Sequence, residues 1–261
     1  KGRVTRPLAY MLYAEMVMIQ ADQSRYTKAL GYMEDLIKSG RYGLLDNYIE
    51  IWDEANEWGS ESIFEINYYD DNSFRGWGDQ LWGPRSYQIN PNPTNPNYAT
   101  IAAGWGFGAV PKHTVAAFDK ADSRLEGSII DLDANGTSTD PGWMATGYHT
   151  YKYACKTENN KDQKADADLG FNNNLRVYRY AETLLNAAEL LVLTGGSQTD
   201  ADKYFNLVHN RAGLPSTTGV TRDQIIDERR LEFVAEGKRY FDLVRTGKAA
   251  SVLTPANDSG N

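Results

Sequence analysis

Tryptophan, tyrosine, amide and charged residues gather in one segment of this chain, between Asn72 and Trp105. A flat aromatic face can cover the apolar C–H face of a sugar ring, and amide, carboxylate or guanidinium groups beside it can bond the hydroxyls in pairs. This mixture of side chains therefore predicts a surface that binds sugars. The alternative is that the rings fill the underside of a long loop. The candidate ligand contacts are Asn72, Arg75, Trp77, Asp79, Trp82, Tyr87 and Trp105.

The stretch from position 70 to position 104 has no regular hydrophobic period and is rich in Gly, Pro and Asn. A connection of this length is usually functional or disordered, and its aromatic content argues against disorder. We therefore expect an ordered, loop-rich ligand surface. The glycine-rich sequence GWGFG, from Gly104 to Gly108, lacks the spacing and the lysine of a phosphate-binding loop, so it predicts no site of its own.

The sequence DLDANG, from Asp131 to Gly136, is similar to the first half of a calcium-binding loop. The residue that should complete such a site, a bidentate glutamate, is replaced by Gly142. We therefore predict no metal site here. Asn135-Gly136 is instead a hairpin signal, which predicts that the segments on its two sides pair with each other.

A dense set of charged residues lies near the C-terminus, and two roles are open for it. Paired carboxylates could act in glycoside hydrolysis, but the helical spacing of these residues favours ion pairs within the protein. We predict the structural role, with Arg230 and Asp242 each in a buried pair. The set comprises Glu228, Arg229, Arg230, Glu232, Glu236, Arg239, Asp242 and Arg245.

Other residues that could carry catalysis are isolated in the sequence. His113, His149 and His209 are far apart and form no H-x-x-x-H pair, and Cys155 is the only cysteine. The chain also has no G-x-S-x-G sequence that would present a nucleophilic serine. We predict no catalytic residue, no bound metal and no cofactor.

Segments whose apolar residues recur with the period of a helix lie before and after these candidate residues. Thr221 and Gln224 predict a capping box at the start of the last helix, and alternation from Ser62 to Tyr69 predicts a short strand. The predicted fold class is mostly α, a helical scaffold with small β-hairpin and long loop insertions. Apolar residues recur at spacings of three and four in residues 7–19, 26–40, 176–196, 201–212 and 221–237.

Several of these segments resemble the SusD/RagB family, and they occur in the family's order. The C-terminal sequences RYAETLLNAAELL, NRAGL and DERRLEFVAEGKRYFDLVRTGK are similar to the family signature. Residues 2–20 and 26–42 resemble its tetratricopeptide-like helices, residues 56–69 its first strand, and residues 105–125 its Pro…Phe…Asp-x-Arg element. The sequence GYHTYKY, from Gly147 to Tyr153, is also typical of the family.

The resemblance implies a tetratricopeptide-like scaffold and a binding protein without catalytic activity. Such a protein captures oligosaccharides or polysaccharides at the outer membrane of the bacterial cell surface and delivers them to a SusC-like TonB-dependent transporter. Binding of a peptide or other nutrient, a carbohydrate-active enzyme, and a scaffold that contacts only the transporter stay open as alternatives. We expect one SusD-like domain composed of a helical hairpin region (1–55), a loop-rich insertion with the ligand surface (56–175) and the signature helices (176–261).

The composition argues against two further kinds of partner. A net charge of -8 would repel the phosphates of nucleic acid, and no run of about 18 apolar residues could span a membrane. Family members carry a lipid on an N-terminal cysteine, whereas Cys155 is internal. The resemblance therefore leads us to expect a longer precursor, with membrane association only through an N-terminal lipid anchor absent from this chain.

Overall fold

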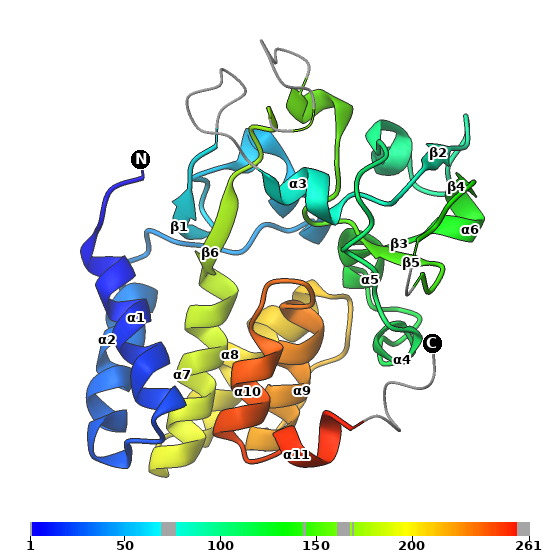
Figure 1. Cartoon of the computed structure of the whole chain (residues 1–261). Coiled ribbons are helices and arrows are strands. Elements are labelled where there is room, and N and C mark those ends of the chain that lie inside the picture. The colour runs from blue at the N-terminus through cyan, green and yellow to red at the C-terminus, as the bar shows by residue number, and fades with distance from the viewer. Residues whose placement is uncertain (1, 69–76, 143–144, 161–167, 169, 255–261) are drawn as a thin grey trace.

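The computed structural model describes residues 2–68, 77–142, 145–160, 168 and 170–254 (Figure 1). Helices from both ends of the sequence form one half of the molecule, which we call the helical half, and the middle of the sequence forms the other, the loop half (Figure 1). The helices of the helical half are α1 (Arg6–Ile19), α2 (Tyr26–Lys38), α7 (Tyr180–Thr194), α8 (Gln198–Arg211), α9 (Arg222–Glu232), α10 (Arg239–Arg245) and α11 (Ala249–Val252). The mostly helical fold class is therefore confirmed.

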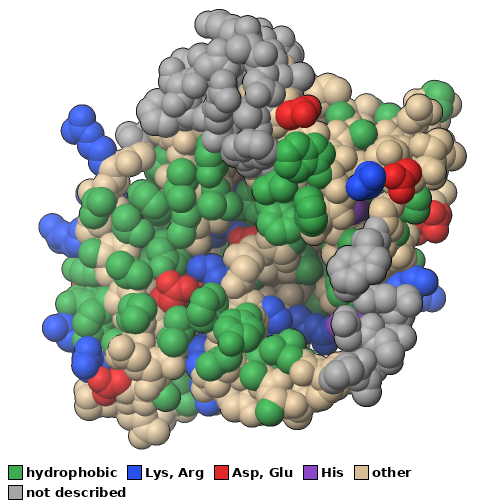
Figure 2. Space-filling model, viewed as in Figure 1, with side chains coloured by type: hydrophobic (Ala, Val, Ile, Leu, Met, Phe, Trp, Pro, Cys, Tyr) green, Lys and Arg blue, Asp and Glu red, His purple; other side chains and the backbone are tan. Residues whose placement is uncertain are grey.

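The loop half contains short elements joined by irregular backbone. Hydrophobic side chains gather on one face of the molecule over the helices and again over α3 (Figure 2). The short helices are α3 (Trp77–Trp82), α4 (Lys112–Val115), α5 (Arg124–Ser128) and α6 (Leu132–Asn135). The 3-10 turns are η1 (Gln23–Arg25), which joins α1 to α2, and η2 (Tyr48–Trp52), η3 (Glu54–Asn56), η4 (Pro96–Thr100) and η5 (Thr157–Asn160). The strands are β1 (Ser62–Ile66), β2 (Tyr87–Ile89), β3 (Ile129–Asp131), β4 (Gly136–Ser138), β5 (Tyr148–Thr150) and β6 (Leu175–Arg179).

Helix α7 is the centre of the helical half. It packs against α2, α8 and α9, while α1 packs against α2 and α10. Every residue from Tyr180 to Leu191 is buried, so the helix is enclosed on all sides. Its polar residues Glu182, Asn186 and Glu189 are buried with it, and burial of a charge is costly unless the charge is paired.

Local signals at the helix ends agree with the sequence. The hydroxyl of Thr5 accepts a hydrogen bond from the backbone of Leu8 at the start of α1. The predicted capping box of Thr221 and Gln224 is confirmed at the start of α9. Helix α7 ends at Gly195, whose φ of +65° is a left-handed conformation that glycine adopts without steric cost.

Three two-stranded antiparallel sheets pair β1 with β6, β2 with β4, and β3 with β5. The hairpin predicted at Asn135-Gly136 is wrong, because β3 and β4 on its two sides pair with other strands. Residues 132–135 instead form α6, which Asp131 caps. The Asn135 side chain is buried, and its oxygen accepts hydrogen bonds from the backbone N–H and the hydroxyl of Thr94 at 2.7 and 2.8 Å.

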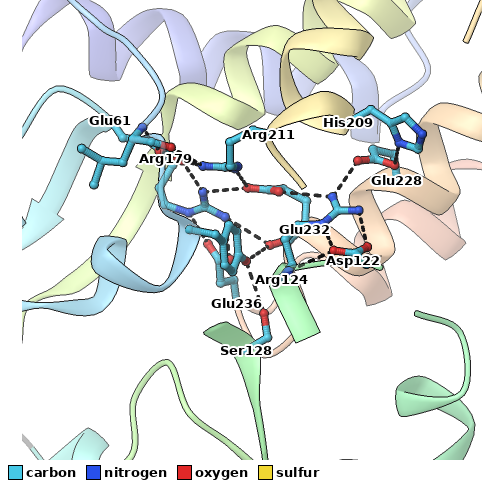
Figure 3. A network of polar contacts seen from close by, with 12 residues as sticks. Glu61, Asp122, Arg124, Ser128, Arg179, His209, Arg211, Glu228, Glu232 and Glu236 are labelled. Carbon is cyan, nitrogen blue, oxygen red and sulfur yellow. Dashed lines mark hydrogen bonds and ion pairs between the residues drawn. The ribbon is translucent and has the colours of Figure 1, made fainter. Parts of the chain in front are cut away.

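A buried ion network joins the two halves (Figure 3). The guanidinium of Arg179, on β6, lies 2.7 Å from Glu61, 2.9 Å from Glu232 and 2.7 Å from Glu236. Arg211, on α8, contacts Glu61 at 3.1 Å and Glu232 at 2.7 Å. None of these side chains is more than 4% exposed. The first strand pair is therefore fixed to α8 and α9 by charge.

The same network reaches further into the loop half through Arg124. This guanidinium lies 2.7 Å from Asp122, 2.6 Å from Glu228 and 3.3 Å from Glu232. The hydroxyl of Tyr48, on η2, donates to the backbone carbonyl of Glu232 at 2.7 Å. Glu232 thus receives contacts from both halves of the molecule.

Glu232 is the carboxylate that the three arginines share. Burial by itself would raise its pKa, but the guanidinium groups of Arg211, Arg179 and Arg124 hold that pKa well below its usual range. A folded-state pKa below the unfolded value means that this carboxylate stabilises the fold above its unfolded pKa. That stabilisation is lost as the pH falls through the acidic range toward the folded pKa.

A second buried network fixes α10 against α9 and α7. Arg229 lies 2.9 Å from Asp242, and Arg245 lies 2.6 Å from Asp242 and 2.8 Å from Glu189. The prediction that Asp242 is in a buried pair is confirmed, but the prediction for Arg230 is wrong. Arg230 is partly exposed and donates to the backbone carbonyl of His113 at 3.3 Å. One step along a helix turns the side chain by about 100°, so Arg229 faces the core in its place.

We predict that Arg124→Ala destabilises the protein by about 3–5 kcal/mol, because it leaves buried carboxylates without their charge partner. The matched control is Arg230→Ala, which should cost less than about 1 kcal/mol because the side chain is at the surface. Urea denaturation of the parent and both variants measures the difference. Equal losses for the two arginines would show that burial of the Arg124 network does not control stability.

Candidate functional site

Three large aromatic side chains are exposed among the described residues of the loop half, and we call the surface that they form the aromatic ridge. Trp82 is the last residue of α3, and Trp105 and Phe107 lie on a later segment. Their exposed fractions are 43%, 39% and 66%. Exposed apolar groups that gather in one place often mark a binding surface, which makes the ridge the candidate site.

Backbone hydrogen bonds hold the two segments of the ridge together. The N–H of Trp105 donates to the carbonyl of Gln80 at 2.8 Å, and the N–H of Phe107 donates to the carbonyl of Leu81 at 2.9 Å. Gly106, between the two rings, has a φ of +87°, a conformation that favours glycine. The backbone that carries these two rings is therefore fixed relative to α3.

Two glycines allow these segments to touch. A Cβ on Gly83 would lie 2.9 Å from the Cα of Gly104 and 2.5 Å from the Sγ of Cys155. Cys155 is buried and its thiol donates to the carbonyl of Asp79 at 3.0 Å. Burial raises the pKa of the Cys155 thiol, so this cysteine is a neutral packing group beneath the ridge and not an activated nucleophile.

The structure separates the sequence-predicted contacts. Trp82 and Trp105 are both exposed, on two segments that backbone hydrogen bonds join. Asp79 and Tyr87 are buried, each with an exposed fraction of 4%, and so offer no surface to a ligand in this structure. Phe107 was not among the predicted residues, although the alternation of glycine and aromatic residues in GWGFG is the signal that could have identified it.

Three further candidates fall where the structure gives no side-chain description. Asn72 and Arg75 lie outside the described residues, and Trp77 begins α3 with its side chain outside them. Ligand contact at these three positions stays a prediction.

The side chain of Asp79, on α3, is a buried carboxyl group. Burial raises its pKa to about 8, against the opposing effect of Lys156 and Arg176. Its Oδ2 has no hydrogen-bond partner among the described residues. The carboxyl is therefore mostly protonated at neutral pH, and the base of the ridge carries no charge at this position.

The comparison with known families decides the relationship of this chain. The sequence profile of the SusD family matches residues 128–261. This chain belongs to the SusD family. SusD-like protein P38 of Formosa agariphila is 28% identical to it over 268 residues, which cover 90% of this chain and 51% of that protein. This chain therefore spans about half the length of the curated relatives that it matches.

Solved structures share the fold of this SusD-family chain. Surface glycan-binding protein A from Bacteroides thetaiotaomicron is 47% identical, with a TM-score of 0.88 over 97% of this chain and 57% of that one. The same protein in complex with laminarihexaose gives a TM-score of 0.86. A laminarin-binding SusD-like protein is 31% identical, with a TM-score of 0.84 over 97% of this chain and 57% of that one. The expected SusD-like scaffold is confirmed.

Within the described part of this SusD-family chain, His, Cys, Asp and Glu side chains form no group of three that could hold a metal ion. The segment from Asp131 to Gly136, which is similar to the first half of a calcium-binding loop, has a structural role. Asp131 caps α6, and the Asn135 side chain accepts a hydrogen bond from Thr94. None of the helices in the same ranges is long and apolar enough to cross a membrane.

We predict that Asp79 makes the protein less stable as the pH rises. Its folded pKa of about 8 lies above the reference value of 3.8, so the folded state keeps a proton that the unfolded chain releases. The stabilisation is fully present below pH 3.8 and is lost as the pH rises to about 8. Asp79→Asn cannot ionise and should flatten this dependence, with a gain over the parent on the order of 5 kcal/mol at pH 8.

Thermal unfolding between pH 4 and pH 9 checks this expectation. Asp227→Asn is the control, because Asp227 is an exposed carboxylate on α9. Parallel pH profiles for the parent and Asp79→Asn would show that Asp79 ionises normally.

Proposed function

We propose that this chain binds a β-1,3-linked glucan and does not cleave it. The observation that carries the proposal is the aromatic ridge of Trp82, Trp105 and Phe107. It occurs in a chain 47% identical to a surface glycan-binding protein whose structure in complex with laminarihexaose gives a TM-score of 0.86. Laminarihexaose is a hexamer of β-1,3-linked glucose, which is the ligand class we assign.

Recognition in this proposal combines ring stacking with paired hydrogen bonds. Sugar rings lie on Trp82 and Trp105, whose backbone segments are held together by hydrogen bonds, so little backbone freedom is lost on binding. Arg85 follows Trp82 closely and forms an exposed ion pair with Asp140 at 2.9 Å, and such groups bond neighbouring hydroxyls in pairs. The affinity of one such site is expected to be roughly micromolar to millimolar.

Membership in the SusD family supports the cellular part of the proposal. The chain acts at the bacterial cell surface, in a protein that a lipid holds at the outer membrane. It passes the glycan to a SusC-like TonB-dependent transporter. The carboxylates of the charged C-terminal set support the non-catalytic reading, because Glu228, Glu232 and Asp242 are buried in ion pairs with arginine.

We predict that Trp82→Ala and Trp105→Ala each weaken laminarihexaose binding by roughly three- to tenfold, because each removes a stacking face. Tyr240→Ala is the matched control, since Tyr240 is an aromatic residue of α10 that is 58% exposed. Isothermal titration gives the affinities, and circular dichroism confirms that the variants are folded. Unchanged affinity in a variant that carries both Trp82→Ala and Trp105→Ala would show that the glycan binds elsewhere.

We also predict that laminarihexaose keeps its length during prolonged incubation with the protein. Chromatography of the mixture against a boiled sample is the measurement. Shorter products that disappear on substitution of a single Asp or Glu would establish an enzyme and refute the non-catalytic proposal.

A further inference from the structure

A cavity of about 320 Å³ opens beside the aromatic ridge. Two of its wall residues belong to the segments that carry the ridge. Gly106 lies between Trp105 and Phe107, and Arg85 follows Trp82 by three positions. The volume is at the lower end of the roughly 300–1,000 Å³ that small-molecule sites occupy. The cavity is therefore adjacent to the ridge and has the scale of a small sugar and not of a long chain.

The opposite wall comes from α6, β4 and β5. Leu132 and Tyr148 supply apolar and aromatic surface, and Asp133 supplies an exposed carboxylate. Gly136 lies against the ring of Tyr87, because a Cβ there would be 2.6 Å from that ring. Apolar surface with a few polar groups is typical of small-ligand sites, and a pyranose presents the same two kinds of surface.

Glycines bring the backbone of the cavity wall close to two of its charged side chains, Arg85 and Asp133. Gly106 and Gly147 have φ values of +87° and +84°, which other residues adopt only with strain. A Cβ on Gly106 would lie 2.9 Å from the Cβ of Arg85, and one on Gly147 would lie 3.1 Å from the Oδ2 of Asp133. The positions of these side chains in the wall thus depend on a backbone conformation that glycine supplies.

His149 adds an unsatisfied polar group to the wall. It is 3% exposed, and neither ring nitrogen has a hydrogen-bond partner of suitable geometry among the described residues. Burial lowers its pKa to about 4, although the backbone of Thr150 and Gly106 nearby opposes this effect. The ring is therefore neutral at physiological pH, with one N–H donor and one acceptor nitrogen. Buried polar atoms without a partner are uncommon because they cost free energy, and both ring nitrogens of His149 are buried behind the cavity surface.

We propose that this cavity holds one pyranose residue of the glycan whose chain stacks on the aromatic ridge. The residue projects from the chain either as a side branch or as its terminal unit. Asp133 accepts hydrogen bonds from its hydroxyls, and Leu132 and Tyr148 pack on its apolar surface. This inference rests on the proposed function and extends it to ligand branching and length.

The test uses the full chain and three probes. They are linear laminarihexaose, linear laminariheptaose, and laminarihexaose with one β-1,6-linked glucosyl branch. Asp133→Ala removes the carboxylate, and Ala109→Leu reduces the volume, since Ala109 lines the cavity. Asp227→Ala is the control for loss of an exposed carboxylate on α9. If Ala109→Leu fails to fold, Asp133→Ala carries the test alone.

The parent should bind one of the two heptasaccharides about three- to tenfold more tightly than laminarihexaose. Asp133→Ala and Ala109→Leu should abolish that gain, and Asp227→Ala should retain it. A gain with the branched probe identifies a side branch, and a gain with the linear heptasaccharide identifies a chain end.

Two results would overturn the inference while the proposed function stands. The first is laminarihexaose binding with no gain for either longer probe, and the second is a gain that both cavity variants retain. Absence of laminarihexaose binding by the parent would overturn the proposed function and this inference with it.

Discussion

The sharing of Glu232 by three arginines is the interaction on which the arrangement of the two halves depends. Arg179, Arg211 and Arg124 come from a strand, a helix and the loop half, and all three reach this one carboxylate. Desolvation of buried charges is costly, and good geometry is needed to offset it. The network is therefore favourable only when every partner is in place. Its main consequence is positional, because it allows one placement of the loop half on the helices.

That placement is transmitted to the ridge through the segment around Cys155. The ammonium group of Lys152 donates to the backbone carbonyl of Glu232 at 3.0 Å. Three residues later, the thiol of Cys155 reaches the carbonyl of Asp79 in α3 at 3.0 Å, and its backbone carbonyl accepts from Ala102 at 2.9 Å. The segment from Lys152 to Cys155 thus contacts the ion network through Lys152. Through Cys155 it contacts α3 and the segment that leads to Trp105. A surface held in this way is preformed for its ligand.

The parts of the fold that sequence could predict are those with local causes. The apolar periods and the capping box of Thr221 depend on neighbouring residues. The capping box was correct and so were most of the helical periods, but residues 176–179 form β6, and the helix expected over 221–237 ends at Glu232. Strand pairing depends on distant segments. The Asn135-Gly136 signal therefore failed, since the buried Asn135 side chain serves Thr94 from a different part of the chain. Arg230 failed for a related reason, because helical spacing alone does not fix which arginine faces the core.

The candidate site was predictable in composition but not in orientation. Trp82 and Trp105 are exposed, whereas Tyr87 and Asp79 from the same segment are buried. In an irregular segment no period reveals which side chains face solvent, so ligand candidates and packing residues look alike. The sequence GWGFG does not have the spacing of a phosphate-binding loop, and its glycines instead permit close backbone contact beneath the exposed rings.

The distribution of charge fits a neutral ligand. Acidic side chains such as Glu232 and Asp242 are buried in ion pairs, and Asp79 beneath the ridge is mostly uncharged at neutral pH because burial raises its pKa to about 8. At the surface beside the ridge, Arg85 is paired with Asp140. A sugar without charge gains nothing from a strong local field, and its recognition depends on ring faces and on hydroxyl groups that both donate and accept. Most of the buried charge in this chain therefore determines its fold, while the proposed glycan binding depends on aromatic surface and on a few polar groups held by glycine-rich backbone.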